Sequence, residues 1–137
     1  METNYGVISD VHKYPGLIGP TIEILKQQGA TKLVLNGDIG AWFGELQKSQ
    51  DYTAIILEAA GKSGLETYVQ PGSHERVIAF EPVVNYFADK YDNIFSTGVN
   101  VENQDHHLAF LPGSDFSCGG EYSIGNGQLQ AGSYVQI

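Results

Sequence analysis

Residues 5–12 read YGVISDVH, a short apolar run that passes directly into an aspartate and, two residues later, a histidine. The same form returns at residues 32–38 (KLVLNGD) and at residues 66–75 (ETYVQPGSHE). Continuous short apolar runs, in contrast to strict alternation, are typical of strands that are covered on both faces. The sequence therefore predicts strands at residues 5–9, 32–36 and 66–70.

Helical patterns lie between and after these three runs. Apolar residues recur at helical spacing within residues 16–28, and Gly29 stands where a helix C-cap belongs. A second helix is expected to run from a cap at Asp51 to residues 61–64, and a third to carry Pro82 in its first turn. Strands that alternate with helices in this way predict parallel βαβ units and an α/β fold.

The pattern changes after the third predicted helix. Residues 94–95 read as a brief strand, and residues 98–101 and 108–111 flank a polar stretch as the two arms of a hairpin do. His106 and His107 fall in that polar stretch. We expect both histidines to be exposed turn residues.

Composition and charge narrow the classes of function. Of the 137 residues, 42% are apolar and 17% charged, which is the composition of a globular domain and not of a disordered chain. The net charge of −9 disfavours nucleic acids and anionic membranes as partners, because both require a basic surface. Cys118, the single cysteine, excludes an intrachain disulfide, and no apolar run approaches membrane-spanning length. These features predict a soluble, cytoplasmic protein.

The residues that follow the predicted strands carry the chemistry. In an open α/β sheet, ligands bind at the carboxyl ends of the strands. There the sequence places two carboxylates, two imidazoles and one hydroxyl: Asp10, His12, Asp38, Ser73 and His74. Oxygen and imidazole donors without thiolate suit Mn²⁺, Fe or Zn²⁺. The plainer alternative is that these residues form strand-end turns, for which Asp, Asn, Ser and Gly have local hydrogen-bonding reasons.

Three motifs in these positions resemble the opening signature of the calcineurin-like dinuclear metallophosphoesterases. That signature is Asp-x-His, then Gly-Asp, then Gly-Asn-His-Glu or Gly-Asn-His-Asp, each after a β-strand; here it is matched by residues 10–12, 37–38 and 72–75. The resemblance covers residues 5–75. It implies the N-terminal part of a four-layer α/β/β/α metallophosphoesterase sandwich, a parallel βαβαβα unit followed by a hairpin.

The resemblance also implies the metal ligands. Asp10 and His12 would bind the first ion, Asp38 would bridge two ions, and Ser73 stands at the position of a second-metal ligand. The ions would be divalent transition metals, with Mn²⁺ first and Fe, Zn²⁺ or Ni²⁺ as alternatives. Where the family has asparagine this chain has Ser73, whose hydroxyl is a shorter and poorer ligand, and Ala41 replaces an acidic residue that often follows the bridging aspartate.

The activity that the resemblance implies is hydrolysis of a phosphate mono- or diester by a metal-bridging hydroxide. Two ions about 3.5–4 Å apart would clamp the phosphoryl oxygens. His74 would be the catalytic residue, donating a proton to the leaving group. Glu75 or a backbone acceptor is expected to hold His74 in place.

The family's later ligands have no counterpart in this sequence, because no Gly-His-x-His motif follows His74. Residues 133–137 are apolar and are expected to form a strand of a second sheet. We therefore expect residues 1–137 to be a metallophosphoesterase-like domain that is incomplete at its C-terminus. A C-terminal continuation or a second chain would complete the site, and residues 1–137 alone would hold at most one ion and show little hydrolysis.

Two other classes of function compete with the enzyme. The first is a non-catalytic or truncated scaffold of the same fold that binds a protein partner. The second is a flavodoxin-like or receiver-like binding module, but residues 11–14 (VHKY) do not form the glycine-rich phosphate loop that such a module places after its first strand. For the enzyme, the acidic charge favours a phosphorylated small molecule or a phosphoprotein as substrate.

Overall fold

The computed structural model describes residues 2–40, 44–96, 101–102, 105–110 and 121–122. A sheet of four parallel strands has the order β1-β2-β3-β4, with β1 at Tyr5–Ile8, β2 at Lys32–Asn36, β3 at Glu66–Gln70 and β4 at Ile94–Ser96. In the register of the first three strands, Tyr5 lies beside Lys32 and Lys32 beside Glu66. The carboxyl ends of these strands therefore meet at one edge, and the predicted strands are confirmed.

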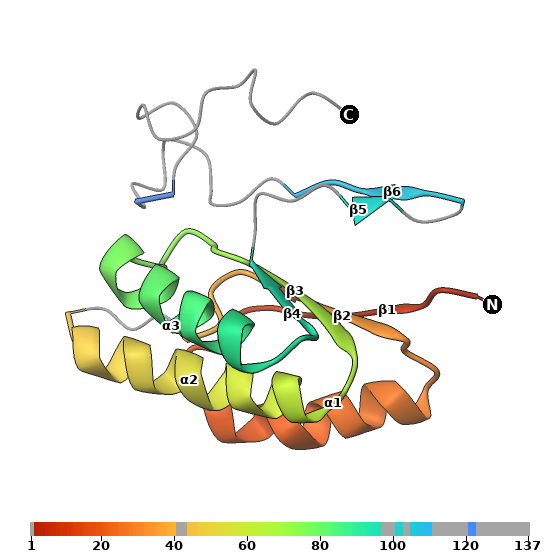
Figure 1. Ribbon diagram of the computed structural model, residues 1–137. Coiled ribbons are helices and arrows are strands. Elements are labelled where there is room, and N and C mark those ends of the chain that lie inside the picture. Colours follow the sequence, from red (N-terminus) through yellow and green to blue (C-terminus); the bar gives the residue numbers. More distant parts are fainter. Residues whose placement is uncertain (1, 41–43, 97–100, 103–104, 111–120, 123–137) are drawn as a thin grey trace.

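Three helices cover one face of this sheet (Figure 1). A short 3₁₀ turn, η1 (Pro15–Leu17), leads into α1 (Ile18–Gln27), and the other two helices are α2 (Leu46–Lys62) and α3 (Val77–Lys90). Strands and helices alternate along the chain, as the hydrophobic pattern predicts. The fold is α/β.

The main core lies between the sheet and the helices. Leu33, Leu35 and Val69 point from the strands toward Ile56 and Leu57 of α2, and all five side chains are fully buried. Alternate residues of β2 and β3 supply this face because successive side chains of a strand point to opposite sides of the sheet. The apolar side of α2 therefore lies at the centre of the molecule.

Helices α1 and α2 end just before glycines, as predicted, but α2 begins earlier than predicted. Gly29 (φ 97°) and Gly64 (φ 77°) adopt the left-handed conformation just beyond the helix ends, where only glycine avoids a steric penalty. Asp51 does not cap α2, because the helix starts at Leu46. The Asp51 carboxylate instead accepts a hydrogen bond from Gln47 Nε2, one turn earlier, at 2.8 Å.

Helix α3 also begins earlier than predicted, so Pro82 lies in its interior and not in its first turn. A proline cannot donate the backbone hydrogen bond to the carbonyl four residues before it, here that of Ile78. Gln50 of α2 takes the place of that donor, since its side-chain Nε2 lies 3.2 Å from the Ile78 oxygen. The packing of α2 against α3 thus satisfies a carbonyl that Pro82 leaves without its helical partner.

A short antiparallel hairpin lies on the other face of the sheet (Figure 1). It consists of β5 (Val101–Glu102) and β6 (His107–Leu108). A second cluster of buried residues forms here from Val34, Tyr68 and Phe110.

The two hairpin histidines differ from each other. His107 is exposed, as predicted, but it belongs to β6 and not to a turn, so that part of the prediction is wrong. His106 is half-buried: its Nε2 lies 2.7 Å from the hydroxyl of Tyr5, and its Nδ1 lies 2.6 Å from Asp105 Oδ1. Because Tyr5 begins β1, His106 attaches the hairpin to the end of the sheet opposite to the strand-end motifs.

Some predictions fall outside the described residues: the strand at residues 133–137, most of the first hairpin arm, Ala41 and Cys118. Among the helices that are described, none has the length and apolar character that crossing a membrane requires.

The two isoleucines at positions 55 and 56 give a direct test of this core. Ile56 is 0% exposed and Ile55 is 47% exposed. We expect Ile56→Ala to lower the free energy of unfolding by about 2–5 kcal/mol, because it removes buried methyl groups and leaves a cavity. Ile55→Ala, the same chemical change at an exposed position, should cost about 0.5 kcal/mol or less. Urea denaturation of both variants measures the difference, and equal losses would contradict the placement of α2.

Candidate metal centre

The backbone pairing of β1 with β2 continues beyond the ends of the two strands. The Asp10 N–H donates to the Gly37 carbonyl at 3.2 Å, and the His12 N–H donates to the Asp38 carbonyl at 3.3 Å. These two bonds hold the residues after β1 beside those after β2. The Asp-x-His motif and the Gly-Asp motif therefore form one continuous structure.

Three residues of these loops adopt backbone conformations that are uncommon for non-glycine residues. Asp10 (φ 57°), His12 (φ 48°) and Asp38 (φ 52°) are all in the left-handed region. Each such residue costs roughly 1–2 kcal/mol relative to an ordinary conformation, and conformations of this kind cluster at functional sites. These conformations change the direction of the chain within a few residues of the strand ends, where the three motif side chains lie.

The loops after β2 and β3 touch at two glycines. A Cβ atom at Gly37 would lie 2.7 Å from the Gly72 Cα, and one at Gly72 would lie 2.6 Å from Asp38 Oδ1 and 2.7 Å from the Asp38 nitrogen. Real Cβ atoms do not come this close to other atoms. Glycine at both positions is thus required for Asp38 to lie against the loop that carries His74.

Glu75 binds the same two loops together. Its side chain is only 2% exposed, and its oxygens accept hydrogen bonds from the N–H groups of Asp38 and Ile39, each at 2.9 Å, and from the N–H of Gly72. The expectation that Glu75 holds the His74 imidazole is therefore not what the structure shows. Two of its three donors come from the β2 loop, 36 and 37 residues away in sequence, and no local pattern predicts that pairing.

The carboxyl groups of Glu75 and Asp38 have pKa values shifted in opposite directions. Burial raises the pKa of Glu75, the negative charge of Asp38 adds to that rise, and the three N–H donors oppose it. Burial would also raise the pKa of Asp38, but hydrogen bonds from the side chain and backbone of His74 and from Ser73 outweigh it and lower that pKa. Asp38 is therefore a carboxylate at neutral pH.

The Asp38 carboxylate is the centre of a close group of side chains. Its Oδ1 accepts from the His74 N–H at 2.8 Å, and its Oδ2 lies 3.0 Å from His74 Nδ1 and accepts from the Ser73 hydroxyl at 3.1 Å. The rings of His12 and His74 meet edge to face, with 5.4 Å between their centroids. One ligand atom from each of His12, Asp38 and His74 lies within 4.8 Å of the other two.

These donors fit a transition metal ion. Ligand atoms about 2.0–2.2 Å from one tetrahedral ion are about 3.3–3.6 Å apart, so side-chain movements of about an ångström would close the group around an ion. Two imidazoles and a carboxylate are donors that Zn²⁺, Fe and Mn²⁺ accept. The candidate metal centre is defined here as His12, Asp38 and His74.

The other two predicted ligands border this centre. An Asp10 carboxylate oxygen lies 3.6 Å from His12 Nε2, and its side chain is 72% exposed. Ser73 Oγ lies 2.9 Å from His74 Nδ1. The structure thus brings all five predicted residues to one edge of the sheet, while their individual roles stay predictions.

Solved structures share this fold. The chain superposes on TT1561 of Thermus thermophilus with a TM-score of 0.58 and 13% identity, over 73% of this chain and 44% of that one. A second solved structure matches with a TM-score of 0.57 and 16% identity, over 73% of this chain and 48% of the other. Both are metallophosphoesterase-fold proteins, and this chain has the fold of the N-terminal part of such structures.

The chain spans less than half the length of these two structures. No protein-family model matches the sequence, and neither does any curated protein. The comparisons therefore define the fold.

The glycine contact gives a test of the centre. In Gly72→Ala, the new Cβ would displace the Asp38 carboxylate or separate the loops, and we expect a loss of about 1–3 kcal/mol in stability. We also expect Mn²⁺ affinity, measured by electron paramagnetic resonance of the free ion, to fall by at least about tenfold. Gly16→Ala is the control, because a Cβ at Gly16 meets nothing within 4 Å. Unchanged Mn²⁺ binding by Gly72→Ala would show that this contact does not shape the centre.

Proposed function

We propose that this chain carries a metal-dependent phosphoesterase site, which hydrolyses a phosphate mono- or diester. The observation that supports the proposal most directly is the group formed by His12, Asp38 and His74 at the carboxyl edge of the sheet. The fold of the N-terminal part of metallophosphoesterase-like structures adds support, since it is the fold that the three motifs imply.

Asp10, His12 and Asp38 are proposed to hold the ion. One ligand atom of His12 lies within 4.8 Å of one of Asp38, and an Asp10 oxygen lies 3.6 Å from His12 Nε2. His74, the third member of the candidate metal centre, is proposed to lie beside the ion and not to bind it. Mn²⁺ is the ion proposed, with Fe, Zn²⁺ or Ni²⁺ as alternatives. A second ion, held by Asp38 and Ser73, would bind only where a C-terminal continuation or a second chain completes the site. A divalent ion there would act as a Lewis acid on the phosphoryl oxygens.

His74 is proposed to donate a proton to the leaving group. Its Nδ1 faces Asp38 Oδ2 at 3.0 Å, and its backbone N–H donates to the other oxygen of the same carboxylate. A carboxylate that accepts from one imidazole nitrogen fixes the tautomer and directs the other nitrogen outward. The His74 side chain is 37% exposed, so its Nε2 can approach a departing alkoxide.

The substrate proposed is a phosphorylated small molecule or a phosphoprotein. The net charge of −9 supports this choice over a nucleic acid. Because the chain spans less than half of the solved structures it matches, a scaffold of the same fold that binds a protein partner is the alternative.

The test is hydrolysis of p-nitrophenyl phosphate and bis(p-nitrophenyl) phosphate with and without added Mn²⁺. We expect slow but measurable Mn²⁺-dependent turnover, since residues 1–137 alone are expected to hold at most one ion. Asp38→Asn should abolish this turnover together with Mn²⁺ binding. His74→Ala should keep the ion and lose about 10²–10⁴-fold in rate, the usual contribution of a proton donor. His107→Ala is the matched control, because His107 is exposed and belongs to the hairpin.

Metal content separates the possible failures of this proposal. If His74→Ala loses the ion together with its activity, His74 is a ligand and not the proton donor. If the unaltered chain binds Mn²⁺ but hydrolyses neither ester, the scaffold alternative holds. Equal losses in His107→Ala and His74→Ala would show that the activity does not come from this centre.

A further inference from the structure

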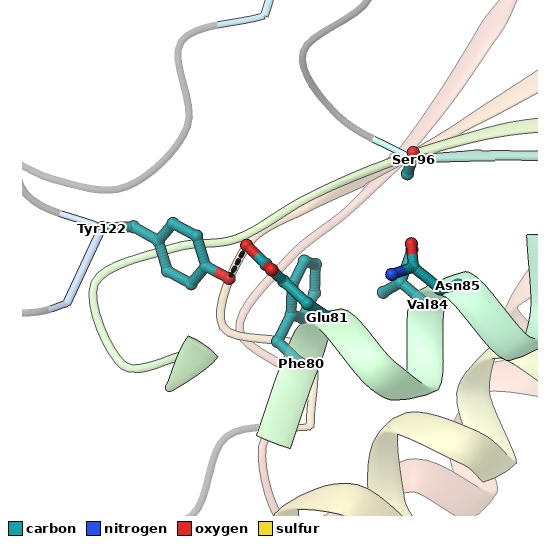
Figure 2. Close-up of a pocket in the computed structure, with 6 residues that line it drawn as sticks. All are labelled: Phe80, Glu81, Val84, Asn85, Ser96 and Tyr122. Atoms are coloured by element: carbon teal, nitrogen blue, oxygen red, sulfur yellow. Dashed lines mark hydrogen bonds between the residues drawn. The ribbon is translucent and has the colours of Figure 1, made fainter. Parts of the chain in front are cut away.

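A cavity of about 160 Å³ lies between helix α3 and the end of β4 (Figure 2). The residues that line it are Phe80, Glu81, Val84, Asn85, Ser96 and Tyr122. Phe80 and Val84 are buried and form an apolar floor, whereas Glu81, Asn85 and Ser96 are exposed and form a polar rim. Cavities near 150 Å³ admit a molecule of roughly the size of benzene.

Tyr122 forms one wall, and two contacts hold it in place. Its hydroxyl donates to Glu81 Oε1 at 3.0 Å, and its ring meets that of Phe80 edge to face, with 6.0 Å between centroids (Figure 2). The preceding residue, Glu121, accepts a hydrogen bond from the Val77 N–H at the start of α3. The wall is therefore attached to α3 at both Val77 and Glu81.

The cavity combines aromatic surface with negative charge. Tyr122 donates to one oxygen of Glu81, and the second oxygen of that carboxylate can face a ligand. None of the six described lining residues is a lysine or an arginine. An anion entering here would meet the charge of Glu81, and a neutral apolar ligand would remove water from that charge without replacing it.

We propose that this cavity binds a small organic ammonium group. The cation would lie against the Glu81 carboxylate and the ring of Tyr122, while its methyl or methylene groups would contact Phe80 and Val84. Cations are attracted to the faces of aromatic rings, and carboxylate with aromatic surface is the combination that recognises alkylated ammonium groups. The volume of about 160 Å³ accommodates a trimethylammonium head group.

This binding is separate from the proposed hydrolysis. None of the lining residues belongs to the metal centre, and the ligand class rests on the cavity alone. The test therefore uses no metal and no phosphate ester, so that its failure and the failure of the proposed activity are distinguishable.

The experiment is a titration of the ¹⁵N-labelled chain, without added metal, followed by amide chemical shifts. The probe is choline, and its uncharged isostere 3,3-dimethylbutan-1-ol has the same shape. We expect choline to give saturable shifts at α3 and at Ser96, with the isostere binding at least about tenfold more weakly because it lacks the charge.

Two variants on the same helix complete the design. Glu81→Gln removes the charge at the cavity, and Asp89→Asn removes one negative charge at an exposed position near the other end of α3. We expect Glu81→Gln to weaken choline binding at least about tenfold and Asp89→Asn to change it less than about twofold. The amide spectrum itself reports whether each variant is folded.

Three results would overturn the proposal. Equal binding of choline and the isostere would mean that the cavity recognises shape without charge. Equal effects of the two variants would mean attraction to the acidic surface in general. The absence of saturable shifts with choline would mean that the cavity takes no ammonium ligand.

Discussion

One buried carboxylate holds the two loops of the candidate metal centre against each other. Glu75 follows β3, yet it accepts hydrogen bonds from the N–H groups of Asp38 and Ile39, which follow β2. A buried N–H that loses its acceptor costs about 1–3 kcal/mol, so these bonds resist separation of the loops. Gly37 and Gly72 can touch only while Glu75 holds the two loops together. The position of Asp38 therefore depends on the Glu75 bonds and on the contact between the two glycines.

The strained backbone at the strand ends also depends on the hydrogen bonds that hold these loops together. Three left-handed residues, Asp10, His12 and Asp38, cost together on the order of 3–6 kcal/mol. The N–H groups of Asp10 and His12 donate to carbonyls after β2, and N–H groups of the same loop donate to Glu75. These bonds offset that cost within one small region. The apolar sheet beneath provides a fixed base, so the side chains of the centre are held before any ion binds.

The sequence predicts the parts of the structure that local patterns determine. The strands follow because each is a continuous apolar run, and the five site residues follow because each comes directly after a strand. The predicted starts of α2 and α3 are wrong: Asp51 pairs with Gln47 one turn away, and the carbonyl that Pro82 leaves unpaired is bonded by Gln50 of another helix. The contacts of Glu75 and Tyr122 could not be predicted for the same reason, since their partners are brought to them only by the completed fold.

The negative charge at this edge of the sheet bears on whether a metal ion or a phosphate group could bind there first. Asp10, Asp38 and Glu75 bring three carboxyl groups to one edge of a chain whose net charge is −9. Glu75 accepts from backbone N–H groups, Asp38 is bonded by His74 and Ser73, and the Asp10 side chain is largely exposed. Two like charges about 5 Å apart repel by about 3 kcal/mol at an effective dielectric constant near 20, so a phosphate approaching the empty edge would be repelled. A divalent cation among these side chains would reverse the local sign. If the proposed function is right, phosphate binding must therefore require the ion first, and the acidic character of the whole chain makes that requirement stricter.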